Sequence, residues 1–361
     1  MLTRRLKISL SLFLLLPAAF RIAQASQSPE QSSSPVTSPS STPAKIDSNG
    51  PGADFSEPRR LLQQGKYDEA IALLKTFETK NPELPGLSHE LGAANYRKGD
   101  YLAATTYLKK AQSEDPKDSE ATQLLGLSYY LAGRPAEAIP ALEKVQTWYP
   151  SANVDASYIL GICYIQTKDY PHARQAFAKM FNVPADSAAS YLFTARMLLR
   201  QDFGPIAEEH IQKAIAQDSK LPLAHQLLGE LYLYQSKIPQ AIEQFQRELE
   251  INPGHAPAYY KLADAYSRVQ KFDDAEKLLQ RSIWLDATST GPYILMGKVL
   301  EKKGEPQLAE RALQRALAMD PSNPMPHHLL GQVYRDLGRS EDSERELKLA
   351  EQLQSRQNEK P

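Results

Sequence analysis

Small and apolar residues recur along this chain at a fixed spacing from about residue 51 onward. The most regular mark is one alanine that follows each helix-starting segment and returns every 34 residues, with a single step of 35 between Ala138 and Ala173. The series consists of Ala70, Ala104, Ala138, Ala173, Ala207, Ala241, Ala275 and Ala309. A period of this length predicts a repeat protein built of short helical units.

Two further positions keep the same register. A glycine usually stands twelve residues before the alanine, and a proline often stands twelve residues after it. The glycines are Gly92, Gly126, Gly161, Gly229, Gly297 and Gly331, the last of them ahead of Ser343, while Ala195 and Ala263 fill this place in two other units. The prolines are Pro82, Pro116, Pro150, Pro253 and Pro321, with Pro184 one residue early. Chance does not keep three positions in register over nine units.

The pattern resembles the tetratricopeptide repeat, whose signature combines Leu-Gly, Tyr, Ala, an apolar residue and Pro. The clearest copy is Leu125-Gly126, Tyr129, Ala138, Leu142 and Pro150. Two other good copies are Leu228-Gly229, Tyr232, Ala241, Phe245 and Pro253, and Leu330-Gly331, Tyr334 and Leu347. The resemblance implies an all-α fold, an α-solenoid of about nine stacked helix-turn-helix units forming a right-handed superhelix, over residues 51–357.

The resemblance also implies the boundaries of the units, and position 1 is the first residue of each unit. The units lie near 51–84, 85–118, 119–152, 154–187, 188–221, 222–255, 256–289, 290–323 and 324–357. Glycine at position 8 of the first helix (helix A) and alanine at position 20 of the second (helix B) remove side chains where the two helices touch. Proline near position 32 ends helix B. One helix pair cannot bury its apolar stripe alone, so neighbouring units stack.

The two ends depart from the pattern as terminal units should. Glu57 and Pro58 occupy the place of Leu-Gly in the first unit, so its first helix is expected to be degenerate or shortened. In the last unit Ser343 replaces the alanine within a polar segment, which suits a helix without a following neighbour.

The N-terminal part predicts export. Arg4, Arg5 and Lys7 precede an apolar run over residues 8–20, and Ala23-Gln24-Ala25 follows, which is the order of a secretory signal peptide over residues 1–25. A membrane anchor over residues 8–25 is the alternative, although the apolar run is short for a span. Residues 26–56 are rich in Ser and Pro and are expected to form a disordered linker. The chain thus resembles exported bacterial tetratricopeptide-repeat proteins, periplasmic or secreted.

Composition and motifs exclude several functions. The formal net charge is −1, and removal of Arg4, Arg5, Lys7 and Arg21 with residues 1–25 takes it to −5, so no nucleic acid is expected as a partner. Cys163 is the single cysteine, and the seven histidines are scattered. We find no phosphate-binding loop, nucleophile elbow or zinc-protease motif. The sequence therefore predicts no enzyme, no metal site and no small-molecule cofactor. Trp148 and Trp284, near the ends of B helices, are expected to seal the next unit.

Helix geometry predicts which face of helix A binds a partner. At about 100° per residue, positions 2, 5, 6, 9, 12 and 13 of helix A lie on one arc, opposite the signature residues, and in the tetratricopeptide family this arc lines the concave groove. In units seven to nine the arc is polar, and in units three to six it is apolar. Contact between adjacent A helices, chiefly through positions 6 and 13, is the alternative explanation. The predicted partner-binding residues are Leu127, Tyr130, Tyr158, Ile162, Ile165, Phe193, Arg196, Arg200 and Tyr234.

Arg196 and Arg200 interrupt the apolar stretch and could hold a carboxylate of the ligand. A salt bridge from either arginine to a neighbouring unit is the alternative. The carboxylate clamp by which relatives bind chaperone tails uses Lys and Asn at positions 5 and 9, and no unit of this chain has that pair.

The sequence thus predicts a non-catalytic scaffold or adaptor that binds a protein, as a peptide, helix or partner loop, within a cell-envelope or secretion assembly. Two alternatives remain open: a self-associating, homo-oligomeric scaffold, and a targeting subunit of a polysaccharide synthesis or export complex. A membrane is a partner only if the N-terminal segment is retained as an anchor.

Overall fold

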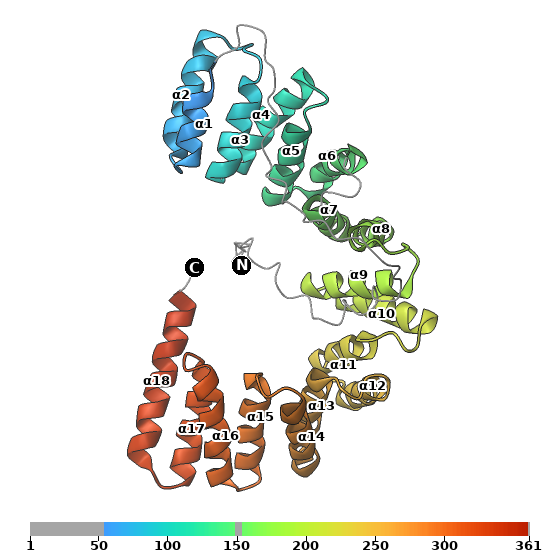
Figure 1. The fold of residues 1–361 in the computed structure, drawn as a ribbon, viewed down its shortest axis with the longest axis vertical. Helices are drawn as coiled ribbons and strands as arrows, with labels where there is room; N and C mark the ends of the chain where they lie inside the picture. Colours follow the sequence, from blue (N-terminus) through green and yellow to red (C-terminus); the bar gives the residue numbers. More distant parts are fainter. Residues whose placement is uncertain (1–53, 149–153, 360–361) are drawn as a thin grey trace, which may run out of the picture. The chain divides into compact units, whose positions relative to one another are not determined.

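The computed structural model describes residues 54–148 and 154–359. Within these residues the chain forms eighteen α-helices and no β-strand (Figure 1). They are α1 (Ser56–Gln63), α2 (Tyr67–Lys80), α3 (Leu87–Lys98), α4 (Tyr101–Glu114), α5 (Ser119–Leu131), α6 (Pro135–Trp148), α7 (Val154–Gln166), α8 (Tyr170–Phe181), α9 (Ala188–Arg200), α10 (Gly204–Gln217), α11 (Ala224–Tyr234), α12 (Ile238–Ile251), α13 (Ala256–Arg268), α14 (Phe272–Leu285), α15 (Thr290–Lys302), α16 (Pro306–Met319), α17 (Pro324–Asp336) and α18 (Ser340–Glu359).

Consecutive helices pack as helix-turn-helix pairs, and each pair also packs against the next. The predicted all-α array of such pairs is therefore confirmed. The odd-numbered helices are the A helices and the even-numbered ones the B helices. The first helix, α1, has 8 residues whereas α2 has 14, so the shortened first helix is also confirmed. The predicted signal peptide, and the predicted linker as far as residue 53, lie outside the described residues.

Glycine at position 8 lets the two helices of a pair approach closely. A Cβ added at Gly126 of α5 would lie 2.7 Å from Leu142 Cδ2 of α6, and one added at Gly161 of α7 would lie 2.5 Å from Phe177 Cε1 of α8. Packed interiors leave no room for such an overlap. The large apolar residue at position 24 thus occupies the space that the missing side chain leaves.

The alanine series marks the second close approach, and all eight of these alanines are fully buried. In the last unit Ser343 replaces alanine and is buried as well. Its hydroxyl donates a hydrogen bond of 2.6 Å to the carbonyl oxygen of Gly331 on α17. Because a buried hydroxyl is costly only when it lacks a partner, serine fits where the other units have alanine.

The turn between helices A and B has one left-handed residue in every unit, at position 15. Five units place glycine there: Gly65, Gly99, Gly133, Gly304 and Gly338. Units four to seven place side-chain-bearing residues there instead: Lys168, Asp202, Ser236 and Gln270, with φ between 59° and 64°. A left-handed conformation costs an L-residue roughly 1–2 kcal/mol. Four consecutive turns therefore carry strain that the other five avoid.

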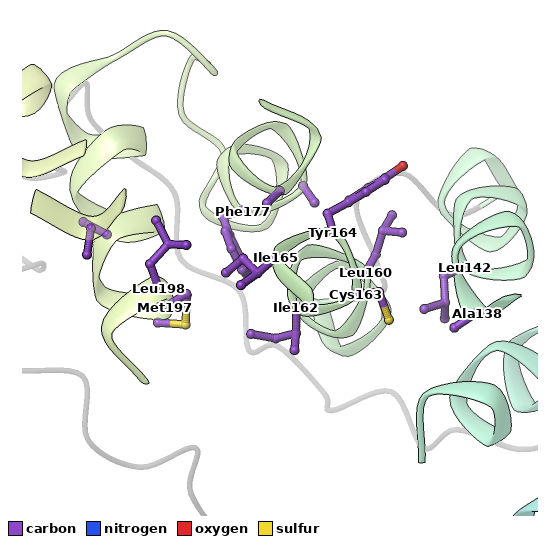
Figure 2. Close-up of a cluster of buried hydrophobic side chains, with 14 of the residues drawn as sticks. Ala138, Leu142, Leu160, Ile162, Cys163, Tyr164, Ile165, Phe177, Met197 and Leu198 are labelled. Atoms are coloured by element: carbon purple, nitrogen blue, oxygen red, sulfur yellow. The ribbon is translucent and has the colours of Figure 1, made fainter. Parts of the chain in front are cut away.

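The central core cluster joins units three to six. Its buried side chains come from α6 to α11 and include Leu142, Leu160, Cys163, Phe177 and Leu198 (Figure 2). In units two and three, a lysine at position 26 forms a hydrogen bond with the end of the preceding unit. Lys144 Nζ donates to the Pro116 carbonyl at 2.7 Å, and Lys110 Nζ donates to the Pro82 carbonyl at 3.1 Å. Of the helices described, none is long and apolar enough to span a bilayer.

Candidate functional site

The candidate partner surface lies on α5, α7, α9 and α11, the A helices of units three to six. Leu127 and Tyr130 lie on α5, and Tyr234 lies at the end of α11. The other six predicted contacts are Tyr158, Ile162 and Ile165 on α7 and Phe193, Arg196 and Arg200 on α9. Their side chains differ in exposure, which divides them into a buried, a half-buried and an exposed group.

Ile162 and Ile165 form the buried group, and here our sequence interpretation needs correction. Ile162 is 1% exposed and Ile165 is fully buried. Both belong to the central core cluster, together with Met197 and Leu198 of α9 (Figure 2). Contact between adjacent A helices thus accounts for these two residues, although they occupy positions 9 and 12 and the alternative explanation had assigned such contact chiefly to positions 6 and 13. Since neither side chain has surface to offer a ligand, we remove both from the candidate surface.

Leu127, Tyr130 and Tyr158 are half-buried and pack against the central core cluster from its rim. Burial raises the pKa of the Tyr130 phenol, and the neighbouring Cys163 and Tyr158 raise it further. Tyr158 also lies near Phe177 of α8, with ring centroids 6.4 Å apart. Each of these three side chains is therefore held by the core on one side and exposes part of its surface on the other.

Phe193 is half-buried and lies against the end of the preceding helix. Its ring centroid lies 4.1 Å from that of Phe181 of α8, with an interplanar angle of 32°. Nearby, the Arg174 guanidinium of α8 lies 4.4 Å from the ring centroid of Tyr191 of α9 and also pairs with Asp186. These contacts fix the start of α9, and with it the direction in which its remaining residues project.

Leu131 and Tyr234 occupy position 13 of α5 and α11, which the alternative explanation would place in contact between adjacent A helices. Instead Leu131 is 39% exposed and Tyr234 is 85% exposed. Position 13 is also exposed in the two units between them, where it is Gln166 and Arg200. The alternative explanation thus fails for Tyr234 and Arg200, the two predicted contacts at position 13, and Leu131 joins the candidate surface as a residue that the prediction omitted. Its presence at the same register as Tyr234 was a signal that could have identified it.

Arg196 is half-buried and Arg200 is exposed. Within the described residues neither guanidinium forms an ion pair or a hydrogen bond, so the predicted alternative, a salt bridge to a neighbouring unit, is not formed there. The two side chains lie four residues apart on one face of α9. We call the surface formed by Leu127, Tyr130, Leu131, Tyr158, Phe193, Arg196, Arg200 and Tyr234 the inner row.

The same arc in later units carries several ion pairs. Lys261 Nζ of α13 lies 3.8 Å from Glu230 Oε1 of α11, and Arg268 of α13 pairs with Asp264 at 2.9 Å. On α15, Lys302 Nζ lies 3.2 Å from Glu301 Oε1. Lys298 of α15 and Arg335 of α17 lie on the same arc without an ion pair among the described residues, but both are exposed to solvent. The inner row differs because it combines apolar area with two unpaired arginines, of which Arg196 is half-buried.

Trp284 was expected to seal the next unit, and this expectation is wrong. The side chain is 72% exposed at the end of α14, and its ring centroid lies 4.3 Å from the Arg281 guanidinium carbon on the same helix. Trp148 is half-buried, with Lys144 Nζ 4.9 Å from its ring centroid. Trp284 is therefore an isolated exposed aromatic residue outside the inner row.

Groups that could support chemistry are inert or dispersed in the described part of the chain. Cys163 is buried, and burial raises the pKa of its thiol to about 12, so the reactive thiolate is scarce at neutral pH. No cluster of three or more His, Cys, Asp or Glu side chains there is placed to hold a metal ion. A hollow of about 560 Å³ lies between α17 and α18, lined mostly by polar residues such as Arg335 and Glu344.

Protein-family models match most of the repeat array. Models described as tetratricopeptide repeats match residues 61–127 and 233–283, and another matches residues 294–357. A model of anaphase-promoting complex, cyclosome, subunit 3 matches residues 96–180. The chain therefore carries tetratricopeptide repeats, as its sequence pattern indicated. No curated protein matches the sequence.

Several solved structures are similar in fold. The APC/C hetero-tetramer Cut9-Hcn1 is 19% identical with a TM-score of 0.43, and the match covers 74% of this chain but only 52% of that one. YrrB, described as a tetratricopeptide-repeat protein with an unusual peptide-binding site, is 21% identical with a TM-score of 0.43, covering 50% of this chain and 94% of that one. MamA from Desulfovibrio magneticus RS-1 is 17% identical with a TM-score of 0.45, covering 48% and 97%.

Proposed function

We propose that this chain is a non-catalytic adaptor that binds a segment of another protein on its inner row. The observation that carries the proposal is the exposure of Tyr234, 85% of whose surface is open on a helix that is otherwise packed into the array. Tyrosine combines a large apolar area with few rotatable bonds and a polar tip, which makes it a favoured anchor in protein interfaces.

The surroundings of Tyr234 favour a binding surface over an isolated exposed residue. Leu131 is exposed at the same register on α5, next to the half-buried Tyr130, and Tyr158 on α7 and Phe193 on α9 present partly open apolar edges on the helices between. Apolar area that gathers on one set of neighbouring helices favours an interaction site. By contrast, Leu102, Trp284 and Leu308 are exposed one at a time on separate B helices, and single exposed apolar residues are normal.

The proposed setting is a cell-envelope or secretion assembly. It rests on the N-terminal sequence, where Arg4, Arg5 and Lys7 precede the apolar run over residues 8–20 and Ala23-Gln24-Ala25 follows. We propose that the chain is exported and works as a periplasmic or secreted protein. An anchored form, held by residues 8–25, would place the same repeats beside a membrane.

Charge substitution on the inner row tests the function. Tagged full-length chain is used to capture partners from the envelope fraction, with Leu131→Asp and Tyr234→Asp in one double variant. Both positions are exposed, so a carboxylate there is solvated and the fold should persist. We expect the captured partners to be lost. The matched control is Trp284→Asp with Leu308→Asp, which alters two exposed apolar residues elsewhere and should retain capture. Capture that survives the inner-row variant would reject the proposal.

Self-association is the second candidate, because an exposed aromatic residue can equally meet another copy of the chain. A homo-oligomeric scaffold requires that the mass measured by light scattering rise with protein concentration. It also requires that the rise vanish in the Leu131→Asp and Tyr234→Asp variant. A constant monomer mass leaves a different protein as the partner.

A further inference from the structure

The positive charges of the inner row lie in an unfavourable arrangement. Arg196 and Arg200 occupy positions 9 and 13 of α9, four residues apart, and so project from one face of the helix. Like charges at this spacing weaken a helix unless a counter-charge lies between them. Within the described residues no carboxylate pairs with either guanidinium.

Arg196 is exceptional among the basic side chains of the described residues. Five of these side chains are half-buried, namely Lys144, Arg174, Arg196, Lys261 and Lys303. Lys144 donates to the Pro116 carbonyl, Arg174 and Lys261 pair with Asp186 and Glu230, and Lys303 pairs with Asp273, Glu276 and Glu305. Arg196 alone has lost part of its hydration without gaining a partner, and such a charge is costly.

The chain contains an internal comparison for this pair. Arg311 and Arg315 on α16 are also four residues apart and also have no ion pair among the described residues. Both are exposed, so water screens their repulsion. The distinguishing feature of α9 is therefore the partial burial of Arg196, and not the spacing of its arginines.

At positions 9 and 13, the helices on either side of α9 supply no free carboxylate. At position 9, α7 carries the buried Ile162, and α11 carries Glu230, which contacts Gln226 at 3.1 Å and Lys261 at 3.8 Å. At position 13, α7 carries Gln166 and α11 carries Tyr234. Glu230 is thus paired with other residues. The residue that corresponds to Arg200 on α11 is Tyr234, whose ring is exposed.

We propose that the segment bound on the inner row is acidic, with two carboxylates that pair with Arg196 and Arg200 and an apolar side chain that packs on Tyr234. The inference rests on the proposed function and adds the chemistry of the partner. Arginines at i and i+4 have Cβ atoms about 6 Å apart. Acidic residues match that separation at i and i+4 of a helix, or at i and i+2 of an extended strand, where the rise is about 3.3 Å per residue. Planar guanidinium groups favour bidentate pairing with carboxylates.

Selection from a random peptide library tests this chemistry while the natural partner is unidentified. Displayed twelve-residue peptides are selected on the full-length chain. Their binding is then measured by fluorescence anisotropy to the wild-type chain and three variants. The variants are Arg196→Gln with Arg200→Gln, the matched control Arg311→Gln with Arg315→Gln, and Tyr234→Ala. Vesicles containing phosphatidylglycerol serve as an anionic probe that is not a peptide.

We expect the selected peptides to be enriched in Asp and Glu at the predicted spacings. Their affinity should fall by about tenfold or more in the α9 variant, because hydrogen bonds to charged groups are stronger than those between neutral groups. Their affinity should be unchanged in the α16 control. The α9 variant should unfold at the same temperature as wild type or higher, because it loses only an unpaired charge. A merely structural arginine would instead lower the unfolding temperature.

Three results would overturn the proposal. Selected peptides without acidic enrichment that still require Tyr234 would reject the acidic partner and keep the proposed function. Peptides that bind independently of both Tyr234 and the α9 arginines, or the recovery of no binding peptide, would reject both. Binding of phosphatidylglycerol vesicles through Arg196 and Arg200, with no acidic peptide selected, would assign these residues to a membrane surface.

Discussion

The ring of Phe245 fills the space where a side chain of Gly229 would begin, because a Cβ added at Gly229 would lie 2.7 Å from Phe245 Cε1. Phe245 is fully buried between α11 and α12. This contact links the glycine at position 8 of the sequence pattern to the packing of one helix pair. The pair carries Tyr234 at the end of α11, so the contact also supports the inner row.

Gly229→Ala should therefore destabilise the chain. The added methyl group overpacks the contact with Phe245, and overpacking typically costs about 1–3 kcal/mol. The measurement is the urea midpoint followed by circular dichroism at 222 nm. Gly254→Ala is the matched control, since the nearest atom to its added Cβ is 3.8 Å away. Equal midpoints for Gly229→Ala and wild type would show that the contact does not limit packing.

Ser236→Gly should stabilise the chain. Ser236 has φ of 59° at position 15 of unit six, where five other units place glycine. Removing the Cβ relieves a left-handed strain of roughly 1–2 kcal/mol, partly offset by the greater flexibility of glycine in the unfolded chain. We expect a higher thermal unfolding midpoint. The reverse change, Gly304→Ser, should lower it, and a lower midpoint for both variants would contradict the explanation.

Glu248→Ala should destabilise unit six at the start of α11. Glu248 is fully buried on α12, and its two carboxylate oxygens accept hydrogen bonds from the backbone N–H groups of Leu223 at 3.0 Å and Gln226 at 3.3 Å. Leu223 is itself left-handed, with φ of 70°. Leaving these donors unpaired costs about 1–3 kcal/mol. Glu250→Ala, at an exposed position of the same helix, should change the urea midpoint little, and similar losses in the two variants would argue against this capping role.

His89 should make stability depend on pH. Its Nδ1 lies 2.6 Å from Asp118 Oδ2, and this hydrogen bond raises the pKa of His89 above 6.5 despite burial, while Glu120 and Glu90 add to the effect. A raised folded-state pKa stabilises the chain fully below the unfolded value, and the benefit is lost as pH rises through the folded value. His89→Gln should thus lower the unfolding free energy more at about pH 5.5 than at about pH 8.5.

The control for this pH dependence is His328→Gln. His328 is exposed on α17, and its only side-chain hydrogen bond among the described residues is with Gln332. The variant should unfold with the same urea midpoint as wild type at both pH values. An equal loss of stability at both pH values in His89→Gln would show that His89 acts through packing and not through its charge.

The fold was predictable because each helix pair depends on positions that local geometry fixes. Gly126 faces Leu142 and Gly161 faces Phe177, in agreement with the pattern of small and large residues along the chain. The candidate surface was less predictable. Ile162 and Tyr158 lie on the same arc of α7, yet only Ile162 is fully enclosed in the core. That difference depends on how neighbouring units pack, which the residues of one helix do not encode.

The turns between helices A and B were also only partly predictable from the sequence. The recurrence of Gly65, Gly99 and Gly133 every 34 residues was a readable signal for a left-handed position. Lys168 and Ser236 occupy the same position without glycine, because the packing of the two helices imposes the turn on any residue there. Propensity alone therefore identifies this turn in five units and misses it in four.

Site-specific photo-crosslinking tests the central claim, that the inner row is the surface a partner occupies. A photoreactive phenylalanine analogue replaces Tyr234, Leu131, Trp284 or Leu308 in turn, all four being exposed, and cells are irradiated. We predict that positions 234 and 131 link to the same partner protein and that positions 284 and 308 give no such product. A partner linked from position 284 or 308, with none from 234 and 131, would contradict the account.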